Sequence, residues 1–297
     1  MGNVRKGVIY ALVTALLWGF LAIALKVASA KVDSVTIVWF RFLVAFISLL
    51  IFHLFRSPSE IKILIRPPWI LVLAALGLSW NYLGFMLGIQ YAGPGSTQVV
   101  IQTGPMTLAL IGIIFFREKV SYRQILGFGL AIAGMATFYH NQIELMLGAE
   151  TQYNMGFLFT LSGAFSWAIY GAMQKKLVVR YSTATLNLFL FGLPVLLYLP
   201  FIDLSPLADL HWGWWVLMVC LGLNTLVAYG SLSMALKYME ASKVSIILIL
   251  NPVITFVSMG ILTFAEVSWI ASEKFSVLSI LGAFIVLAGA VLVVKKK

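Results

Sequence analysis

One apolar segment, broken near its middle by a proline, occurs twice in this chain. Residues 95–119 carry Pro105, and residues 242–266 carry Pro252. Each segment is long enough to cross a bilayer, and a proline inside a helix leaves the carbonyl four residues earlier without its hydrogen-bond donor. In a membrane that carbonyl needs a partner from a neighbouring helix or a water-filled cavity. A duplicated broken helix is therefore typical of a transport site.

The composition of the chain places it in a membrane. Of its 297 residues 62% are hydrophobic and 10% are charged, and the mean hydropathy is +1.02, so no water-soluble fold could cover its apolar surface. Apolar stretches of about 17–25 residues predict membrane-spanning helices. The sequence thus predicts an all-α membrane protein with ten transmembrane helices, at residues 7–28, 35–56, 69–91, 95–116, 121–139, 155–178, 183–201, 212–237, 242–264 and 277–294. The single cysteine, Cys220, excludes an internal disulfide and a cysteine-rich metal site.

The net charge of +10 orients the chain in the membrane and does not indicate nucleic-acid binding. If the N-terminus faces the cytoplasm, the segments on that side hold 16 of the 20 Lys and Arg residues. Most acidic residues then fall on the other side, and this asymmetry follows the positive-inside rule. It predicts a multi-pass protein of a bacterial inner membrane with both termini in the cytoplasm.

The ten predicted helices are an internal duplication of five. In the first and sixth helices, Trp18 and Trp167 each follow a glycine by 11 residues. The fifth and tenth helices each carry two glycines seven residues apart, namely Gly127 and Gly134, and Gly282 and Gly289. Because five is odd, the second half (151–297) enters the membrane upside down relative to the first (1–150), which gives two inverted repeats around a central cavity. Inverted repeats supply the two conformations that alternating access requires.

The layout of the two halves resembles the drug/metabolite transporter superfamily, and within it the EamA family of ten-helix bacterial carriers. The resemblance covers nearly all of residues 7–294. It depends on Trp18 and Trp167 and on a repeated order of proline, glutamate and glycine, namely Pro105, Glu118 and Gly127, then Pro252, Glu266 and Gly282. The second half departs from the first by additional residues at 269–276, expected as an external loop. Family members include amino acid exporters, among them aromatic amino acid exporters of the YddG type, and carriers of other metabolites and drugs. The resemblance therefore implies a transporter and leaves its substrate open.

Polar and aromatic side chains near the middle of the predicted helices are candidates for a substrate cavity. In the fourth helix Gln98, Gln102 and Pro105 share one face, at i, i+4 and i+7. The full set of candidate substrate-binding residues is Gln98, Gln102, Pro105, Trp18, Trp167, Tyr170, Asn251, Tyr82, Asn81, Asn224, Lys26 and Arg41. The alternative for the amides is interhelical hydrogen bonding, and for the aromatic rings it is anchoring at the lipid interface.

Four charged residues lie in or beside the predicted helices. Arg41 lies six residues into the second helix, and Lys26 lies near the outer end of the first. A charge in a membrane segment is costly unless it is paired or hydrated, so either cation could receive a substrate carboxylate or phosphate. Alternatively both extend outwards to water, or one pairs with Asp33. Glu118 and Glu266 follow the broken helices on opposite faces of the membrane, where structural capping or ion pairing is favoured over gating.

These observations predict a secondary transporter that exports or exchanges small organic metabolites by alternating access. Amino acids, aromatic or otherwise apolar, are the favoured substrates, and nucleotide-like or sulfonium metabolites or drugs are the alternative. A membrane-embedded enzyme or a lipid scramblase is the alternative outside transport, but the sequence carries no hydrolytic or redox motif and predicts no enzyme, cofactor or metal site. The expected partners are a small-molecule substrate and the lipid bilayer, with no nucleic acid, in a monomer or homodimer.

Overall fold

A computed structural model describes the chain except for residues 1, 139, 141–150, 268–275 and 295–297. In the first half the helices are α1 (Gly2–Ala28), α2 (Ser34–Arg56), the 3-10 helix η1 (Pro58–Leu64), α3 (Trp69–Ile101), α4 (Thr103–Ile114) and α5 (Tyr122–Phe138). In the second half they are α7 (Thr151–Leu177), α8 (Thr183–Tyr198), η2 (Leu199–Phe201), α9 (Ser205–Ala208), α10 (Trp212–Tyr238), α11 (Ala241–Leu248), α12 (Asn251–Phe264) and α13 (Val277–Val294). The described residues confirm the predicted all-α membrane fold. The predicted external loop at 269–276 lies almost wholly outside them.

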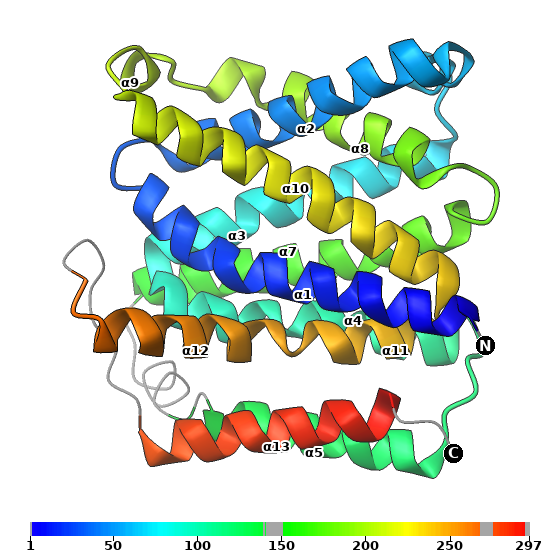
Figure 1. The fold of residues 1–297 in the computed structure, drawn as a ribbon, viewed down its shortest axis with the longest axis vertical. Helices are drawn as coiled ribbons and strands as arrows, with labels where there is room; N and C mark the ends of the chain where they lie inside the picture. The colour runs from blue at the N-terminus through cyan, green and yellow to red at the C-terminus, as the bar shows by residue number, and fades with distance from the viewer. Residues whose placement is uncertain (1, 139, 141–150, 268–275, 295–297) are drawn as a thin grey trace.

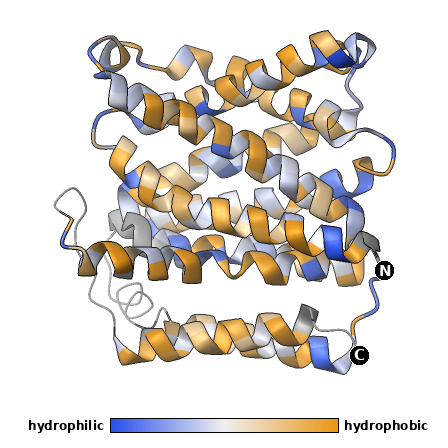
Figure 2. Cartoon of the chain, in the orientation of Figure 1, coloured by the Kyte–Doolittle hydropathy of each residue, from blue (hydrophilic) through white to orange (hydrophobic). Residues whose placement is uncertain are grey.

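The helices have the lengths and surfaces that a bilayer requires. Seven described helical segments are long and apolar enough to cross a membrane, and two shorter apolar helices, Thr103–Ile114 and Ile280–Leu292, accompany them. Figure 2 shows hydrophobic residues along most of the helices. Large apolar side chains such as Phe55 and Phe264 are almost fully exposed. Exposure of such apolar side chains to water is unfavourable, whereas their contact with lipid is not, so the exposed surface is that of a membrane protein.

The two proline-containing segments are broken where the sequence predicts. Helical structure ends at Ile101 and resumes at Thr103 in the first half, and it ends at Leu248 and resumes at Asn251 in the second. Ile101 and Leu248 are the residues whose carbonyls the prolines leave without their usual donor. The sequence also predicts a turn near residue 92, whereas α3 stays helical to Ile101. The direction of the chain is nevertheless reversed by the time it reaches α4, which runs back towards the side from which α3 started (Figure 1).

The helices form two groups that face each other across the centre. In one group α7 packs on α3 and α4, and in the other α1 packs on α10, α11 and α12. Helices α2 and α8 pack together and cover one end. Because α1 and α7 are equivalent in the two halves, each group combines helices from both halves. Both repeats therefore contribute helices to the interface between the groups, for example where α11 packs on α4.

Helices α5 and α13 form a separate pair below the two groups (Figure 1). A Cβ atom added to Gly134 would meet Val286 N at 2.7 Å, and one added to Gly289 would meet the Gly127 carbonyl oxygen at 2.6 Å. The glycines that the sequence places on one face of each helix thus allow the two backbones to touch. The sequence left open whether these faces pack within one chain or between two, and the structure shows that they pack within one.

Candidate functional site

A cavity of about 90 Å³ lies between the two groups of helices, at the level where the proline-containing segments are broken. Nine of the twelve predicted substrate-binding residues line it: Trp18, Arg41, Asn81, Tyr82, Gln98, Gln102, Pro105, Trp167 and Asn251. They come from α1, α2, α3, α4, α7 and α12, and Gln102 lies in the break itself. The volume has room for several water molecules or a small solute. The structure therefore brings most of the predicted residues together, and their role in substrate binding stays a prediction.

The amide side chains at the breaks carry unused hydrogen-bonding capacity. The side-chain oxygens of Gln98, Gln102 and Asn251 are buried and have no hydrogen-bond partner among the described residues. A buried amide oxygen without a partner costs free energy, so native structures rarely contain such groups without a reason. All three residues line the same cavity, so a solute or water in the cavity would supply the missing partners.

Arg41 is the one charged residue in the cavity lining of the described structure. It is 3% exposed, so it does not extend outwards to water. Its Nε donates a hydrogen bond to Thr225 Oγ1 at 3.1 Å, one terminal nitrogen donates to the Tyr82 hydroxyl at 3.4 Å, and the guanidinium lies 4.6 Å from the centre of the Tyr82 ring. Asp33 instead accepts hydrogen bonds from the backbone N–H groups at the start of α2. Within the described chain no carboxylate pairs with Arg41, so its charge has no protein counter-ion.

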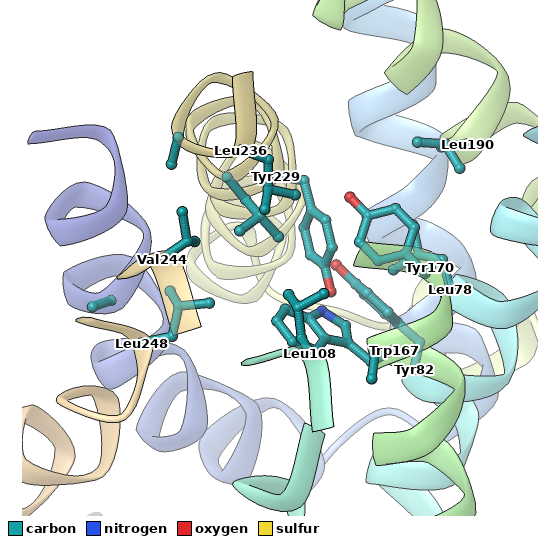
Figure 3. Close-up of a cluster of buried hydrophobic side chains, with 14 of the residues drawn as sticks. Leu78, Tyr82, Leu108, Trp167, Tyr170, Leu190, Tyr229, Leu236, Val244 and Leu248 are labelled. Carbon is teal, nitrogen blue, oxygen red and sulfur yellow. The ribbon is translucent and has the colours of Figure 1, made fainter. Parts of the chain in front are cut away.

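Aromatic rings form one wall of the cavity. Trp18 and Trp167, the equivalent residues of the two repeats, meet edge to face with ring centres 5.8 Å apart. The Tyr229 ring lies 5.2 Å from that of Trp18 and 5.7 Å from that of Tyr82. Figure 3 shows Tyr82, Trp167, Tyr170 and Tyr229 gathered in this cluster. Such rings offer apolar faces to the body of a solute while the amides and Arg41 offer polar contacts.

Three predicted residues lie outside the cavity lining. Tyr170 is buried behind the wall, with its ring 5.8 Å from that of Tyr229. Asn224 Nδ2 donates to the Leu17 carbonyl oxygen at 2.9 Å, which is the interhelical hydrogen bond that the sequence offered as the alternative. Lys26 is half-buried on the last turn of α1. None of the three touches the cavity, and the structure leaves their predicted contact with substrate without support.

Several lining residues were missing from the predicted set. Leu21, Phe85, Ile101 and Leu248 are apolar, and periodicity cannot separate an apolar cavity wall from an ordinary helix contact. Tyr229 could have been chosen instead of Asn224. It lies four residues after Thr225, so both side chains are on the face of α10 that meets Arg41.

The cavity is closed on one side by α11. The start of α1 and the end of α13 lie on the same side of the molecule, here called the terminal side (Figure 1). On that side α11 packs against α4, and the Glu118 carboxylate accepts hydrogen bonds from the backbone N–H groups of Ala241 and Ser242. This is the capping role that the sequence favoured for Glu118. On the opposite side the described parts of α3 and α12 are not closely packed against each other.

The described residues contain no group of three or more His, Cys, Asp and Glu side chains that could hold a metal ion. The polar groups of the cavity are one guanidinium, amides and hydroxyls. Such groups bind and orient a solute by hydrogen bonds and charge.

Comparison with known proteins agrees with this architecture. The model of the EamA-like transporter family matches residues 5–139 and 154–295. The chain is 32% identical to the "Uncharacterized inner membrane transporter YhbE" of Escherichia coli K12, over 96% of this chain and 89% of that protein. It is 26% identical to the "Probable amino-acid metabolite efflux pump" of the same organism, over 96% and 93% of the two chains. A solved crystal structure shares the fold with a TM-score of 0.75 at 18% identity, covering 97% of this chain and 96% of that one. The chain, with seven described helical segments of membrane-spanning length and two shorter apolar ones, is a multi-pass membrane protein that belongs to the EamA-like transporter family.

Proposed function

We propose that this protein is a secondary transporter of the inner membrane that exports or exchanges amino acids, especially aromatic and other apolar ones, by alternating access. The observation that carries the proposal is Arg41, a buried cation at the cavity wall without a counter-ion among the described residues. A buried charge is stable only when it is paired or hydrated. A substrate carboxylate is the partner that this arrangement lacks.

The remaining groups of the cavity complement the rest of an amino acid. The guanidinium keeps three of its five N–H groups free of described partners, enough to bind a carboxylate through two parallel hydrogen bonds. The partnerless amide oxygens of Gln98, Gln102 and Asn251 can accept hydrogen bonds from a substrate ammonium. Trp18 and Trp167 provide a surface for an apolar or aromatic side chain. The printed name of the Escherichia coli efflux relative refers to amino-acid metabolites and supports the same class.

The same features favour a direction of transport and a coupling mechanism. The positive-inside rule places the terminal side in the cytoplasm, so the described conformation would be closed to the cytoplasm. The cavity lining of the described structure includes no Asp or Glu, which proton-coupled carriers commonly use as a relay. Facilitated export or exchange therefore needs fewer assumptions than proton coupling.

A carrier for nucleotide-like metabolites is the second candidate. The observation in its favour is that a guanidinium beside aromatic rings can bind a phosphate and stack on a base. A cationic drug would find only Arg41 as a charged group in the described lining and would be repelled by it. The position of the cavity between the two helix groups, at the level of the two helix breaks, favours a carrier over a membrane-embedded enzyme or a lipid scramblase.

Counterflow in proteoliposomes tests the proposal. Vesicles with purified protein are loaded with an unlabelled solute, and uptake of a labelled one is measured against a panel of amino acids, nucleotides and cationic dyes. We expect uptake of an aromatic amino acid that other apolar amino acids compete away and cationic dyes do not. Protein-free vesicles give the background. Competition by nucleotides alone would favour the second candidate, and competition by cationic dyes alone would contradict both.

A further inference from the structure

The turn between α10 and α11 is held by two charged side chains of the other helix group. Glu118 accepts hydrogen bonds from Ala241 N at 2.7 Å, Ser242 N at 3.0 Å and Ser242 Oγ at 2.7 Å. Lys175 Nζ donates to the Met239 carbonyl oxygen at 2.6 Å and lies 3.7 Å from the Glu118 carboxylate. The turn at residues 239–242 with these two side chains is here called the clasp.

The charges of the clasp match the helix ends that they contact. The Lys175 ammonium contacts the C-terminal end of α10, where backbone carbonyls carry negative partial charge. The Glu118 carboxylate contacts the N-terminal end of α11, where N–H groups carry positive partial charge. The Glu118 side chain is 5% exposed and the Lys175 side chain 18%, so water screens these contacts weakly. Glu118 and Lys175 extend from the α3–α4–α7 group to the α1–α10–α11–α12 group. The clasp therefore joins the two groups on the terminal side, where the cavity is closed.

The inverted repeat carries a second pair of residues in equivalent positions. Lys175 follows Trp167 by eight residues, and Lys26 follows Trp18 by eight. Glu118 and Glu266 follow the proline of their half at nearly the same distance, 13 residues after Pro105 and 14 residues after Pro252. Each helix end has a residue with positive φ, which is Arg117, just before Glu118, at 51° in the first half and Glu266 itself at 52° in the second. By inversion, Lys26 and Glu266 lie on the side opposite the terminal side.

The second pair makes no comparable contact with the residues that the structure describes. Glu266 is exposed, and neither its carboxylate nor the Lys26 ammonium forms a hydrogen bond or ion pair with the described residues. The contact of Glu266 equivalent to that of Glu118 would be with the chain after Tyr91, which corresponds in sequence to the α10–α11 turn after Tyr238.

We propose that Glu118 and Glu266 are the two gating residues of this transporter, each closing one side of the cavity by capping the broken helix of the opposite group, and that they are engaged alternately. The inference rests on the proposed transport function and adds the contacts that hold each end state. Removal of Glu118 shifts the equilibrium towards the state open on the terminal side. Removal of Glu266 shifts it the other way.

Cysteine accessibility measures this equilibrium without any substrate. In a Cys220→Ser background, Ser245→Cys reports on the terminal side, because Ser245 is fully buried on α11 behind the clasp. Ala22→Cys, in the cavity lining, reports on the opposite side. The rate of reaction with a water-soluble thiol reagent is measured in lipid nanodiscs, where both faces are accessible.

Charge-assisted hydrogen bonds to buried groups are strong, so we expect Glu118→Gln to raise the Ser245→Cys rate about tenfold and to lower the Ala22→Cys rate. Glu266→Gln is expected to lower the Ser245→Cys rate.

Two further variants separate gating from general loss of structure. Gly112→Ala perturbs the clasp without removing a charge, because the new Cβ would lie 2.7 Å from Glu118 Oε2 and 3.2 Å from Ser242 N. It is expected to act in the same direction as Glu118→Gln. Glu60→Gln removes a carboxylate that binds Ser182 outside the clasp and is expected to change neither rate.

Opposite shifts from the two glutamate variants support the proposal, because simple destabilisation would raise both rates in both variants. Unchanged rates in folded Glu118→Gln protein, or shifts of the same sign from Glu118→Gln and Glu266→Gln, would overturn it. The labelling experiment contains no substrate. A failed counterflow experiment together with opposite labelling shifts would therefore reject the proposed substrates but not the two gating residues.

Discussion

Replacing Arg41 with methionine removes the only charge in the described cavity lining while keeping an unbranched apolar side chain of similar length. The fold should tolerate the change. Arg41 is 3% exposed and has no described counter-ion, so its desolvation is not offset by an ion pair. Its two hydrogen-bond partners, Tyr82 and Thr225, remain hydrogen-bonded without Arg41. The Tyr82 hydroxyl lies 3.4 Å from Thr225 Oγ1, and Thr225 also donates to the Leu221 carbonyl oxygen. We expect the unfolding temperature to stay unchanged or to rise.

The effect on binding should be large. If the free N–H groups of Arg41 hold the substrate carboxylate, the variant leaves a desolvated carboxylate without its partner. Truncation of one member of a buried, hydrogen-bonded charge pair costs about 2–5 kcal/mol. At about 1.4 kcal/mol per factor of ten, the lower bound corresponds to a rise in Kd of at least about 30-fold. Arg41→Lys should fall between the wild type and the methionine variant, because it keeps the charge and loses the planar pair of donors.

The assay compares an aromatic amino acid with its carboxamide, which has the same body but no negative charge, as competitors in counterflow. The wild type should prefer the acid, and Arg41→Met should remove most of that preference by weakening the acid alone. Arg56→Met, an exposed cation at the other end of α2, is the matched control and should change neither affinity. An unchanged preference for the acid in folded Arg41→Met protein would refute the assignment of Arg41 as the carboxylate site.

Other substitutions test the cavity wall and the helix packing. Gln102→Ala should weaken transport without loss of folded protein, because its side-chain oxygen has no described partner to lose; reduced yield of purified protein would favour a structural role. Trp167→Ala should raise the Km for aromatic substrates more than for small ones, and equal increases would argue against contact with the side chain. Gly282→Leu should lower thermal stability by about 1–3 kcal/mol or more, since even a Cβ there would lie 2.4 Å from Phe138 N. Gly129→Leu, where a Cβ would meet nothing within 4 Å, is its control, and equal losses in the two would contradict the packing argument.

Much of the architecture could be predicted because it depends on local properties. Apolar length locates a membrane helix, and a proline locates its break, so the interruptions after Ile101 and Leu248 follow from the sequence. The equivalence of Trp18 and Trp167 follows from the internal repeat. Nine of the twelve predicted site residues line the cavity because polar side chains at mid-depth are costly against lipid and so face the interior.

What only the tertiary structure decided are the contacts between distant helices. Helical periodicity tells which residues share a face, but not which neighbour that face meets. Arg41 bonds to Thr225 across 184 residues, and Glu118 caps a helix that begins 123 residues later. Asn224 and Tyr229 are both polar and mid-helix, yet their rotation about α10 directs one to the Leu17 carbonyl and the other to the cavity. The sequence alone therefore determined a duplicated, broken-helix membrane carrier, and tertiary packing decided which polar groups satisfy one another and which have no partner among the described residues.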